Sequence, residues 1–167
     1  ERKLINKFYQ ASQAGVNITL VVRGICCLRP GVAGLSDNIT VKSLIGRFLE
    51  HGRIYVFSNG DVLGSAANQI YIASADMMPR NMYRRVESFI PLENQTVRKQ
   101  ILEQVVTAID EDTENCWQLQ SDGCYVKAET DGDGFSSHDY FMQNPSLSGQ
   151  GSLSGERGEQ AKETGGR

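Results

Sequence analysis

The chain has 167 residues, of which 40% are hydrophobic, and its formal net charge at pH 7 is −3. This length and composition suffice for one ordinary hydrophobic core and a tail. The chain opens on Glu1 inside a charged pattern, with no signal peptide and no apolar run near the roughly 20 residues of a membrane span, which argues against a secreted or membrane-spanning class. We therefore expect a soluble piece from the C-terminal part of a longer protein.

The charge is unevenly distributed along the chain. Counting Lys and Arg against Asp and Glu, residues 1–19 sum to +2, residues 20–90 to +3 and residues 91–167 to −8. Seven of the eight basic residues in the middle segment are arginines: Arg23, Arg29, Arg47, Arg53, Arg80, Arg84 and Arg85. A guanidinium binds two oxygens of a phosphate or carboxylate at once, so this segment predicts recognition of such groups. The acidic remainder argues against general nucleic-acid binding.

The first elements predict an α/β arrangement. Residues 1–14 carry apolar side chains at helical spacing, and Gly15 is the expected stop. The unbroken apolar run 17–22 predicts a central parallel strand covered on both faces. Arg23 follows this strand at its carboxyl end, where open α/β sheets bind ligands. The long loop 24–38 is therefore expected to be functional, and a plain surface crossover is the alternative.

The middle of the chain is predicted to contain short strands. Residues 42–50 show helical spacing and predict a short amphipathic helix that ends at His51. Two β-like runs, 53–57 and 69–73, follow on either side of a turn. A Pro- and Arg-bearing connection over residues 77–84 and a third strand over residues 85–90 complete this part.

The last third predicts one long helix and a hairpin. Asn94 is the expected N-cap of a helix over residues 95–109, and the apolar stripe of this helix is expected to be buried. Cys116 and Cys124 flank a hairpin turn, and the sequence leaves open whether they face each other across it. Both are expected to be reduced.

The C-terminal stretch yields two further expectations. His138 is interpreted as a structural histidine rather than a ligand. From Asn144 onward the sequence is rich in glycine and serine and poor in apolar residues, which predicts a disordered tail over residues 145–167.

Four side chains are predicted to meet beside the two β-like runs. His51 and Arg53 sit two residues apart at the start of the first run, and Ser74 and Asp76 repeat this spacing at the end of the second. If the runs pair, these groups share one sheet edge. An imidazole, a guanidinium and a carboxylate together suit phosphoryl chemistry. The alternative is that His51 caps a helix and Arg53 is a solvated edge charge.

Three stretches carry a family resemblance. They are Val22 to Asn38 (VRGICCLRPGVAGLSDN), Gly46 to Arg53 (GRFLEHGR), and Tyr71 to Asp76 (YIASAD) followed by Arg80 and Asn81. Together they closely resemble the C-terminal domain of the long-chain polyphosphate kinases over roughly residues 1–145. The resemblance implies a phospholipase D-like α/β fold, with a mixed sheet flanked by helices and a domain over residues 1–144.

The resemblance also implies an activity and a set of site residues. That family reversibly transfers the terminal phosphate of ATP to inorganic polyphosphate through a phosphohistidine. Arg23 and His51 match its nucleotide-contacting residues, with His51 as the catalytic candidate. Arg53, Ser74, Asp76 and Arg80 match the remaining ATP- or phosphate-binding positions.

Other parts of the family's site are expected outside this chain. The histidine that becomes phosphorylated and the groups associated with Mg²⁺ belong to the preceding domain, so no metal ligand is assigned here. The implied partners are ATP, ADP, polyphosphate, the upstream domains and further copies of the chain in a homo-oligomer. Nucleic acid is not expected, membrane association is at most peripheral, and the expected location is cytoplasmic.

Three departures and two alternatives accompany the resemblance. Ala73, Met77 and Asp61 stand where the family pattern has glycine, tryptophan and glycine, so activity is open to change in the full protein. A phospholipase D-type phosphodiesterase or nuclease is one alternative, although Arg53 and Asp76 replace the lysine and asparagine of its motifs. A non-catalytic polyanion-binding module is the other.

Overall fold

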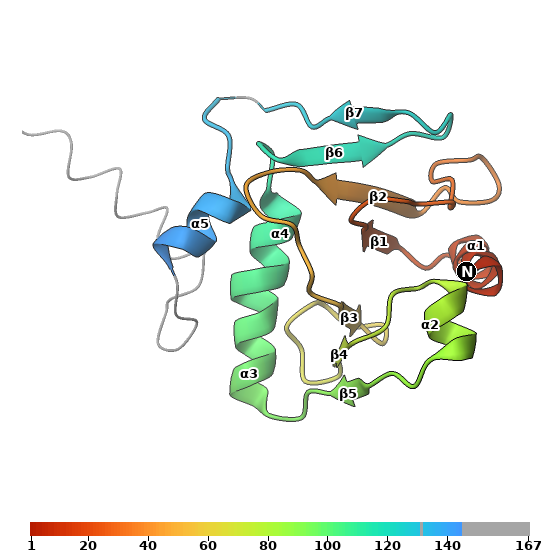
Figure 1. The fold of residues 1–167 in the computed structure, drawn as a ribbon, viewed down its shortest axis with the longest axis horizontal. Coiled ribbons are helices and arrows are strands. Elements are labelled where there is room, and N and C mark those ends of the chain that lie inside the picture. The colour runs from red at the N-terminus through yellow and green to blue at the C-terminus, as the bar shows by residue number, and fades with distance from the viewer. Residues whose placement is uncertain (131, 145–167) are drawn as a thin grey trace, which may run out of the picture. The chain divides into compact units, whose positions relative to one another are not determined.

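The computed structural model describes residues 1–130 and 132–144, which form two compact units. The first unit comprises Glu1–Arg53, Ser74–Ser88 and Asp112–Ser136. The second comprises Ile54–Ala73, Phe89–Glu111 and residues 137–144. Each unit contains its own sheet, and helices accompany both (Figure 1). The expected tail over residues 145–167 lies outside the described residues.

The first unit is built on a mixed four-stranded sheet. Its strands are β1 (Ile18–Val21), β2 (Ile39–Leu44), β6 (Cys116–Leu119) and β7 (Tyr125–Lys127), in the order β1-β2-β6-β7. Strands β1 and β2 are parallel, and the other pairs are antiparallel. Two helices, α1 (Arg2–Gln13) and α2 (Pro79–Arg84), belong to the same unit. The expected α/β class, with a mixed sheet and flanking helices, is confirmed.

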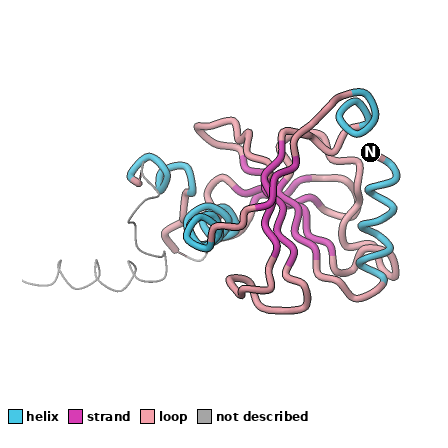
Figure 2. The backbone as a smooth tube through the Cα atoms, turned by 90° about the horizontal axis from the view of Figure 1, so that it is seen from below, coloured by secondary structure: helices cyan, strands magenta, loops and turns pink. Residues whose placement is uncertain are grey.

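The core of the first unit lies between α1 and this sheet. Buried Leu28, Ile39, Val41 and Leu119 form its centre, and Phe8 of α1 packs against them. Burying each of these large side chains stabilises the fold by about 1.5–3 kcal/mol. Helix α1 ends one residue before Ala14, as the apolar spacing predicted. Residues 22–38, by contrast, form neither helix nor strand and belong to the loop segments of Figure 2.

The expectation that residues 17–22 form a central strand covered on both faces is wrong. Within the described residues β1 pairs only with β2, so it lies at the edge of its sheet. Its side chains alternate between half-buried and exposed, and Val21 is 44% exposed. An uninterrupted apolar run therefore does not distinguish a central strand from an edge strand with one covered face.

The predicted helix over residues 42–50 is also absent. Lys42, Ser43 and Leu44 continue β2, because they pair with Gln118, Trp117 and Cys116 of β6. The next amide, that of Ile45, donates to the carbonyl of Asn115 at 2.8 Å. Those contacts use the backbone groups that a helix would need, so the chain continues to His51 as a bent loop.

The second unit contains an antiparallel sheet of three short strands, β3 (Ile54–Phe57), β4 (Gln69–Ala73) and β5 (Phe89–Pro91). The predicted pairing of the first two runs is confirmed. Strand β5 starts later than the predicted strand 85–90, and the connection before it contains the unpredicted helix α2. On one face of this sheet Phe89 stacks on Tyr71 at 4.7 Å between ring centroids and lies 5.0 Å from Tyr55.

A continuous helical segment follows β5. It consists of α3 (Gln95–Gln100), the π-helical η1 (Ile101–Val106) and α4 (Thr107–Glu111), and the helix α5 (Ser137–Gln143) comes after the first unit's hairpin. The Asn94 cap is confirmed, since its side chain accepts from the Val97 amide at 3.1 Å. The π-helical turn was not predicted. It shifts the helical phase, so that Leu102, Gln104 and Ala108 are the buried positions.

The loop between β3 and β4 is closed by buried polar contacts. Asn68 is 2% exposed, and its amide donates to the carbonyls of Ser58 and Val62. The guanidinium of Arg98 reaches the carbonyls of Ala66 and Asn68. This loop is therefore fixed by specific hydrogen bonds rather than by an apolar core.

Asp61, one of the three departures, closes the turn within that loop. Its carboxylate accepts from the hydroxyl of Ser65 and from the amide of Val62. These two hydrogen bonds lower the pKa of Asp61 below its usual value. The aspartate thus has a local structural role.

Cysteines and the remaining histidine occupy unremarkable positions. Cys116 and Cys124 do not lie opposite each other across the hairpin, because Leu119 lies opposite Tyr125. His138 is 1% exposed, in accord with a structural histidine. None of the helices formed by residues 1–130 and 132–144 has the length and apolar character to cross a membrane.

Two tyrosines of the first unit provide a matched test of its packing. The buried hydroxyl of Tyr125 has no hydrogen-bond partner among the described residues, and its burial raises the pKa of this side chain. We expect Tyr125→Phe to raise the free energy of unfolding by about 1 kcal/mol, because an unpaired buried polar group is destabilising. Urea unfolding of the 167-residue chain measures the change.

The control is Tyr9→Phe. The hydroxyl of Tyr9 accepts from the backbone amide of Arg29 at 2.9 Å, so its removal should lower the free energy of unfolding by about 1 kcal/mol. Equal destabilisation by the two substitutions would contradict the prediction.

Candidate functional site

The candidate site is centred on an ion pair between Arg53 and Asp76. Arg53 directly precedes β3, and Asp76 follows β4 by three residues, so the pairing of these strands brings the two positions together. The Arg53 Nε donates to Asp76 Oδ1 at 3.0 Å, and Nη2 lies 2.8 Å from the same oxygen. The Arg53 side chain is only 17% exposed. A partly buried pair of this geometry is fixed more firmly than a surface ion pair.

The same guanidinium holds His51. Its Nη1 lies 3.0 Å from the ring Nδ1 of His51 and donates to the backbone carbonyl of that residue at 2.9 Å. The imidazole itself is exposed. Of the five N–H donors of Arg53, four face Asp76 or His51, so Arg53 is mainly a positioning group.

Two further arginines lie around this cluster. Arg80 Nη2 is 3.6 Å from Asp76 Oδ2, and its side chain is 57% exposed. Arg23 donates from Nη1 to the carbonyl of Glu50, the residue before His51, at 2.7 Å. Partial burial acts to raise the pKa of Asp76, but the hydrogen bond from Arg53 and the charges of Arg53, Arg80 and Arg23 lower it overall. The carboxyl is thus ionised and surrounded by cations.

Ser74 does not join this cluster. Its hydroxyl donates to Glu87 in a short hydrogen bond and accepts from the Ser88 amide at 3.0 Å. Glu87 also accepts from the side-chain amide of Asn81 at 2.6 Å. The hydrogen bonds from Ser74 and Asn81 lower the pKa of Glu87. The structure therefore brings His51, Arg53, Asp76 and Arg80 together and holds Ser74 in a second, adjoining network.

Sequence reasoning missed Glu87 and Asn81. A signal was available in the strand expected over residues 85–90, had it been paired with the run 69–73. In that arrangement Glu87 falls next to Ser74, and the Ser74 amide indeed donates to the Ser88 carbonyl at 3.1 Å. Asn81 was among the residues that carry the family resemblance, but its contact with Glu87 could not be predicted because it depends on the unpredicted helix α2.

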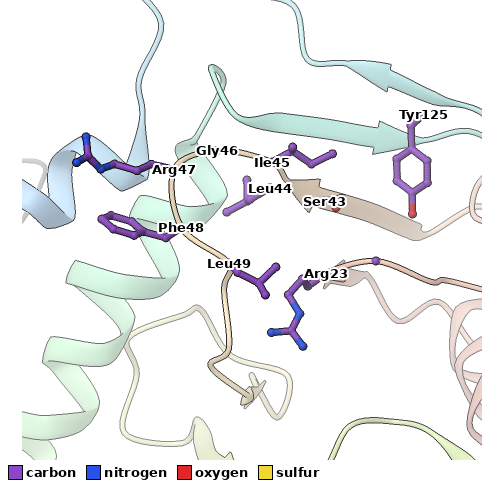
Figure 3. Close-up of a pocket in the computed structure, with 10 residues that line it drawn as sticks. Arg23, Ser43, Leu44, Ile45, Gly46, Arg47, Phe48, Leu49 and Tyr125 are labelled. Carbon is purple, nitrogen blue, oxygen red and sulfur yellow. The ribbon is translucent and has the colours of Figure 1, made fainter.

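A cavity of about 450 Å³ adjoins Arg23 within the first unit (Figure 3). Its wall is formed by the end of β2 and the following segment over residues 45–49, with Arg23 and Tyr125 completing it. Most of this surface is apolar, as shown by the side chains of Ile45 and Leu49 in Figure 3. The cavity joins an apolar lining to the cationic group of Arg23, a combination that suits an amphipathic anion.

The carboxylates of the site do not fit a Mg²⁺ ion. Both oxygens of Asp76 face arginines, and Glu87 is engaged by Ser74 and Asn81. Mg²⁺ requires oxygen ligands that are not already neutralised in this way. Over residues 1–130 and 132–144 there is also no group of three His, Cys, Asp or Glu side chains placed to hold a metal.

Comparison with known proteins links this chain to one family. The family model described as polyphosphate kinase C-terminal domain 2 matches residues 1–138. The polyphosphate kinase of Erythrobacter litoralis is 57% identical over 148 residues, which cover 89% of this chain and 21% of that protein. The polyphosphate kinase of Synechocystis sp. is 50% identical over 127 residues, or 76% of this chain and 17% of that protein.

A solved structure agrees with these sequence matches. The crystal structure of polyphosphate kinase from Porphyromonas gingivalis superposes with a TM-score of 0.78 at 33% sequence identity. The match covers 88% of this chain and 22% of that one. The chain thus spans about a fifth of the length of the relatives that it matches.

The Asp76 ion pairs predict a specific pH dependence of stability. Asp76→Asn ends both pairs, so we expect a loss on the order of 1 kcal/mol in the free energy of unfolding at neutral pH. The pKa of Asp76 is lower in the folded than in the unfolded chain. Its contribution is therefore present above the unfolded pKa of about 3.9 and is lost as the pH falls through the folded pKa.

Urea unfolding of the parent and the variant between pH 7 and pH 2.5 measures this contribution. The difference between the two should be constant above about pH 5 and should shrink below it. Glu129→Gln is the control, because Glu129 is exposed and forms no ion pair in the described part of the chain. A difference that stays constant down to pH 2.5 would contradict the prediction.

Proposed function

This chain belongs to the polyphosphate kinase C-terminal domain 2 family, and from that membership we propose that it forms the nucleotide-facing half of a phosphotransferase active site. The reaction is the reversible transfer of the terminal phosphate of ATP to inorganic polyphosphate. One observation carries the proposal: an exposed imidazole, His51, is held by Arg53 beside two further arginines. Residues 1–144 are proposed to act as one functional domain.

Arg23 and Arg80 supply the charge that meets the phosphates. Phosphoryl transfer spreads negative charge over the equatorial oxygens of the moving group, and guanidinium groups stabilise that charge. Arg80 keeps most of its donors available, because its one carboxylate contact is long and its side chain is largely exposed. Arg23 combines a cation with the apolar cavity, which is proposed to receive the nucleoside part of ATP.

His51 acts as a hydrogen-bond donor to phosphate. A guanidinium has only donors, so in the neutral ring the Nδ1 of His51, which faces Arg53, is the acceptor of this hydrogen bond. The proton of neutral His51 is then on Nε2, where it points to the exposed side and is ready to bind a phosphate oxygen. A protonated Nε2 is not a nucleophile. The covalent phosphohistidine step accordingly belongs to a histidine of the preceding domain.

Asp76 and Arg53 keep His51 in this state. The carboxylate of Asp76 fixes the guanidinium, and the guanidinium fixes the ring and its tautomer. Neither residue is engaged with the reacting atoms. The two therefore position His51, much as a buried carboxylate orients the imidazole of a catalytic triad, although here a cation lies between them.

The partners follow from the same proposal. They are ATP, ADP and polyphosphate, the domains that precede this one in the longer relatives, and further copies of the chain in a homo-oligomer. Mg²⁺, where the reaction uses it, is held outside this chain, and the proposed location is cytoplasmic. Within the described residues, the Arg53–Asp76 ion pair gives no specific support to a phosphodiesterase.

Two substitutions of His51 in the full-length parent test its role. His51→Ala should abolish most ATP-dependent polyphosphate synthesis, with a fall of about 100-fold or more in kcat/KM. His51→Gln keeps an N–H donor near the position of Nε2, so it should retain clearly more activity than alanine. Labelled ATP and product chromatography measure both rates. Equal loss in the two variants would contradict the donor role, and parent-like synthesis by His51→Ala would remove His51 from the mechanism.

The 167-residue chain alone should bind phosphate polymers weakly and catalyse nothing. Its exposed guanidinium contacts are screened by salt, so its affinity for polyphosphate should fall steeply as ionic strength rises. Binding titrations at several salt concentrations measure this. Incubation with labelled ATP and Mg²⁺ provides the second test: acid-labile, base-stable phosphate on the chain would contradict the prediction, since it marks an N–P bond.

A further inference from the structure

Tyr125 brings a buried hydroxyl to the cavity beside Arg23. Tyr125 starts β7 and lies opposite Leu119 of β6. Ser43 of β2 lies opposite Trp117, which stands two residues before Leu119 in the same strand. Because directly paired residues share a face of the sheet, and so do residues two apart in a strand, Tyr125 and Ser43 lie on one face. Both side chains line the cavity, and the ring of Tyr125 reaches from β7 toward β2 (Figure 3).

The fold leaves this hydroxyl without a partner. A buried tyrosine hydroxyl usually forms a hydrogen bond, but the Oη of Tyr125 forms none with the described residues. The hydroxyl of Tyr9, also in the first unit, accepts from the backbone amide of Arg29. An unpaired buried hydroxyl destabilises the folded chain, whereas a phenylalanine ring would fill the same space without this effect. The group that satisfies the hydroxyl of Tyr125 therefore comes from outside the described residues, and the cavity that Tyr125 lines is the place for it.

The polar side chains of the cavity wall are of two kinds. Arg23 and Arg47 are cations and suit phosphate, whereas Ser43 and Tyr125 carry neutral hydroxyls. A hydroxyl both donates and accepts, so it is a partner for an uncharged polar group such as the edge of a nucleobase. The apolar side chains of the wall suit the flat faces of the same base; they are Leu44, Ile45, Phe48 and Leu49.

Arg23 indicates how a nucleotide lies in the cavity. Its guanidinium donates to the carbonyl of Glu50, next to His51, so it belongs to the end of the site that receives phosphate. The sugar separates the phosphates of ATP from the base, and the base is the part that gains most from leaving water. A buried hydroxyl within a mostly apolar wall is therefore matched to the base.

We propose that the hydroxyl of Tyr125 forms a hydrogen bond with the base of ATP and thereby selects nucleotides over phosphate compounds that lack a base. This inference rests on the proposed function, in which the cavity receives the nucleoside part of ATP. It gives a role to a residue that stands outside the arginine cluster. Tyr125 contacts no reacting atom, so its effect belongs to nucleotide binding and not to phosphate transfer.

The test uses two matched substitutions in the full-length parent enzyme, Tyr125→Phe and Tyr9→Phe. Each removes one phenolic hydroxyl from the first unit, but Tyr9 does not line the cavity, and its hydroxyl binds a backbone amide. The measurements are KM for ATP, KM for polyphosphate, kcat and the melting temperature. A fifth measurement is the inhibition constant of ribose triphosphate, which has the sugar and the phosphates of ATP but no base.

We expect Tyr125→Phe to raise KM for ATP about threefold to tenfold, the effect of one lost hydrogen bond between neutral groups. The values of kcat and of KM for polyphosphate should stay within about twofold of the parent, because the reacting groups are unchanged. Inhibition by ribose triphosphate should not change. The melting temperature should rise, so that weaker nucleotide binding accompanies a more stable protein. A substitution that only damages the fold does not give this combination.

Three results would overturn the inference. An unchanged KM for ATP in Tyr125→Phe is the result expected if a trapped water satisfies the hydroxyl. Equal weakening of ATP and of ribose triphosphate would assign the hydroxyl to the sugar or the phosphates. A rise in KM for ATP in Tyr9→Phe as large as that in Tyr125→Phe would show that the effect is not specific to the cavity.

A parent enzyme that transfers no phosphate from ATP would refute the proposed function instead. Equilibrium binding of ADP to the parent and to Tyr125→Phe then decides about the hydroxyl. Weaker binding by the variant supports the inference, whereas equal binding by both proteins, or binding by neither, overturns it.

Discussion

The contact between the guanidinium of Arg53 and the carboxylate of Asp76 connects the fold of this chain to its chemistry. Arg53 stands at the start of β3 and Asp76 just beyond the end of β4, so the register of these strands determines whether the two groups meet. His51 precedes them in a loop without secondary structure. Its ring is oriented by Arg53, and Arg53 is oriented by Asp76. A shift in the register between β3 and β4 would therefore separate Arg53 from Asp76, and the imidazole of His51 would lose its orientation.

This contact also determines which arginines are left to bind a ligand. Asp76 neutralises one of the positive charges of Arg23, Arg53 and Arg80, and most donors of Arg53 are already engaged. The cluster nevertheless keeps a net positive charge. Because Arg23 and Arg80 are exposed, we propose that their remaining donors bind the anion, while Arg53 holds His51 in a defined geometry. Binding and positioning are thus assigned to different members of one arginine cluster.

The sequence predicted those elements that depend on local pattern. Helix α1, the Asn94 cap and the pairing of β3 with β4 were all expected from spacing or capping chemistry. The failures come from distant partners. Residues 42–44 have helical spacing, yet they pair with β6 about seventy residues later in the chain. No local sequence pattern indicates that partner. The same holds for β1, whose apolar run gave no sign that it would lie at a sheet edge.

The site was predictable to the extent that it depends on the strand pairing. The i, i+2 spacing placed Arg53 beside Asp76, but Ser74 met Glu87 instead of the cluster. Glu87 lies in the chain segment that returns toward β5, and it also holds Asn81 at the start of α2. The segment that carries Asp76 is therefore attached at both ends, through Ser74 and through Asn81. Ser74 contributes to the site by fixing the backbone on which Asp76 stands, and a hydroxyl can do this without ever contacting a phosphate.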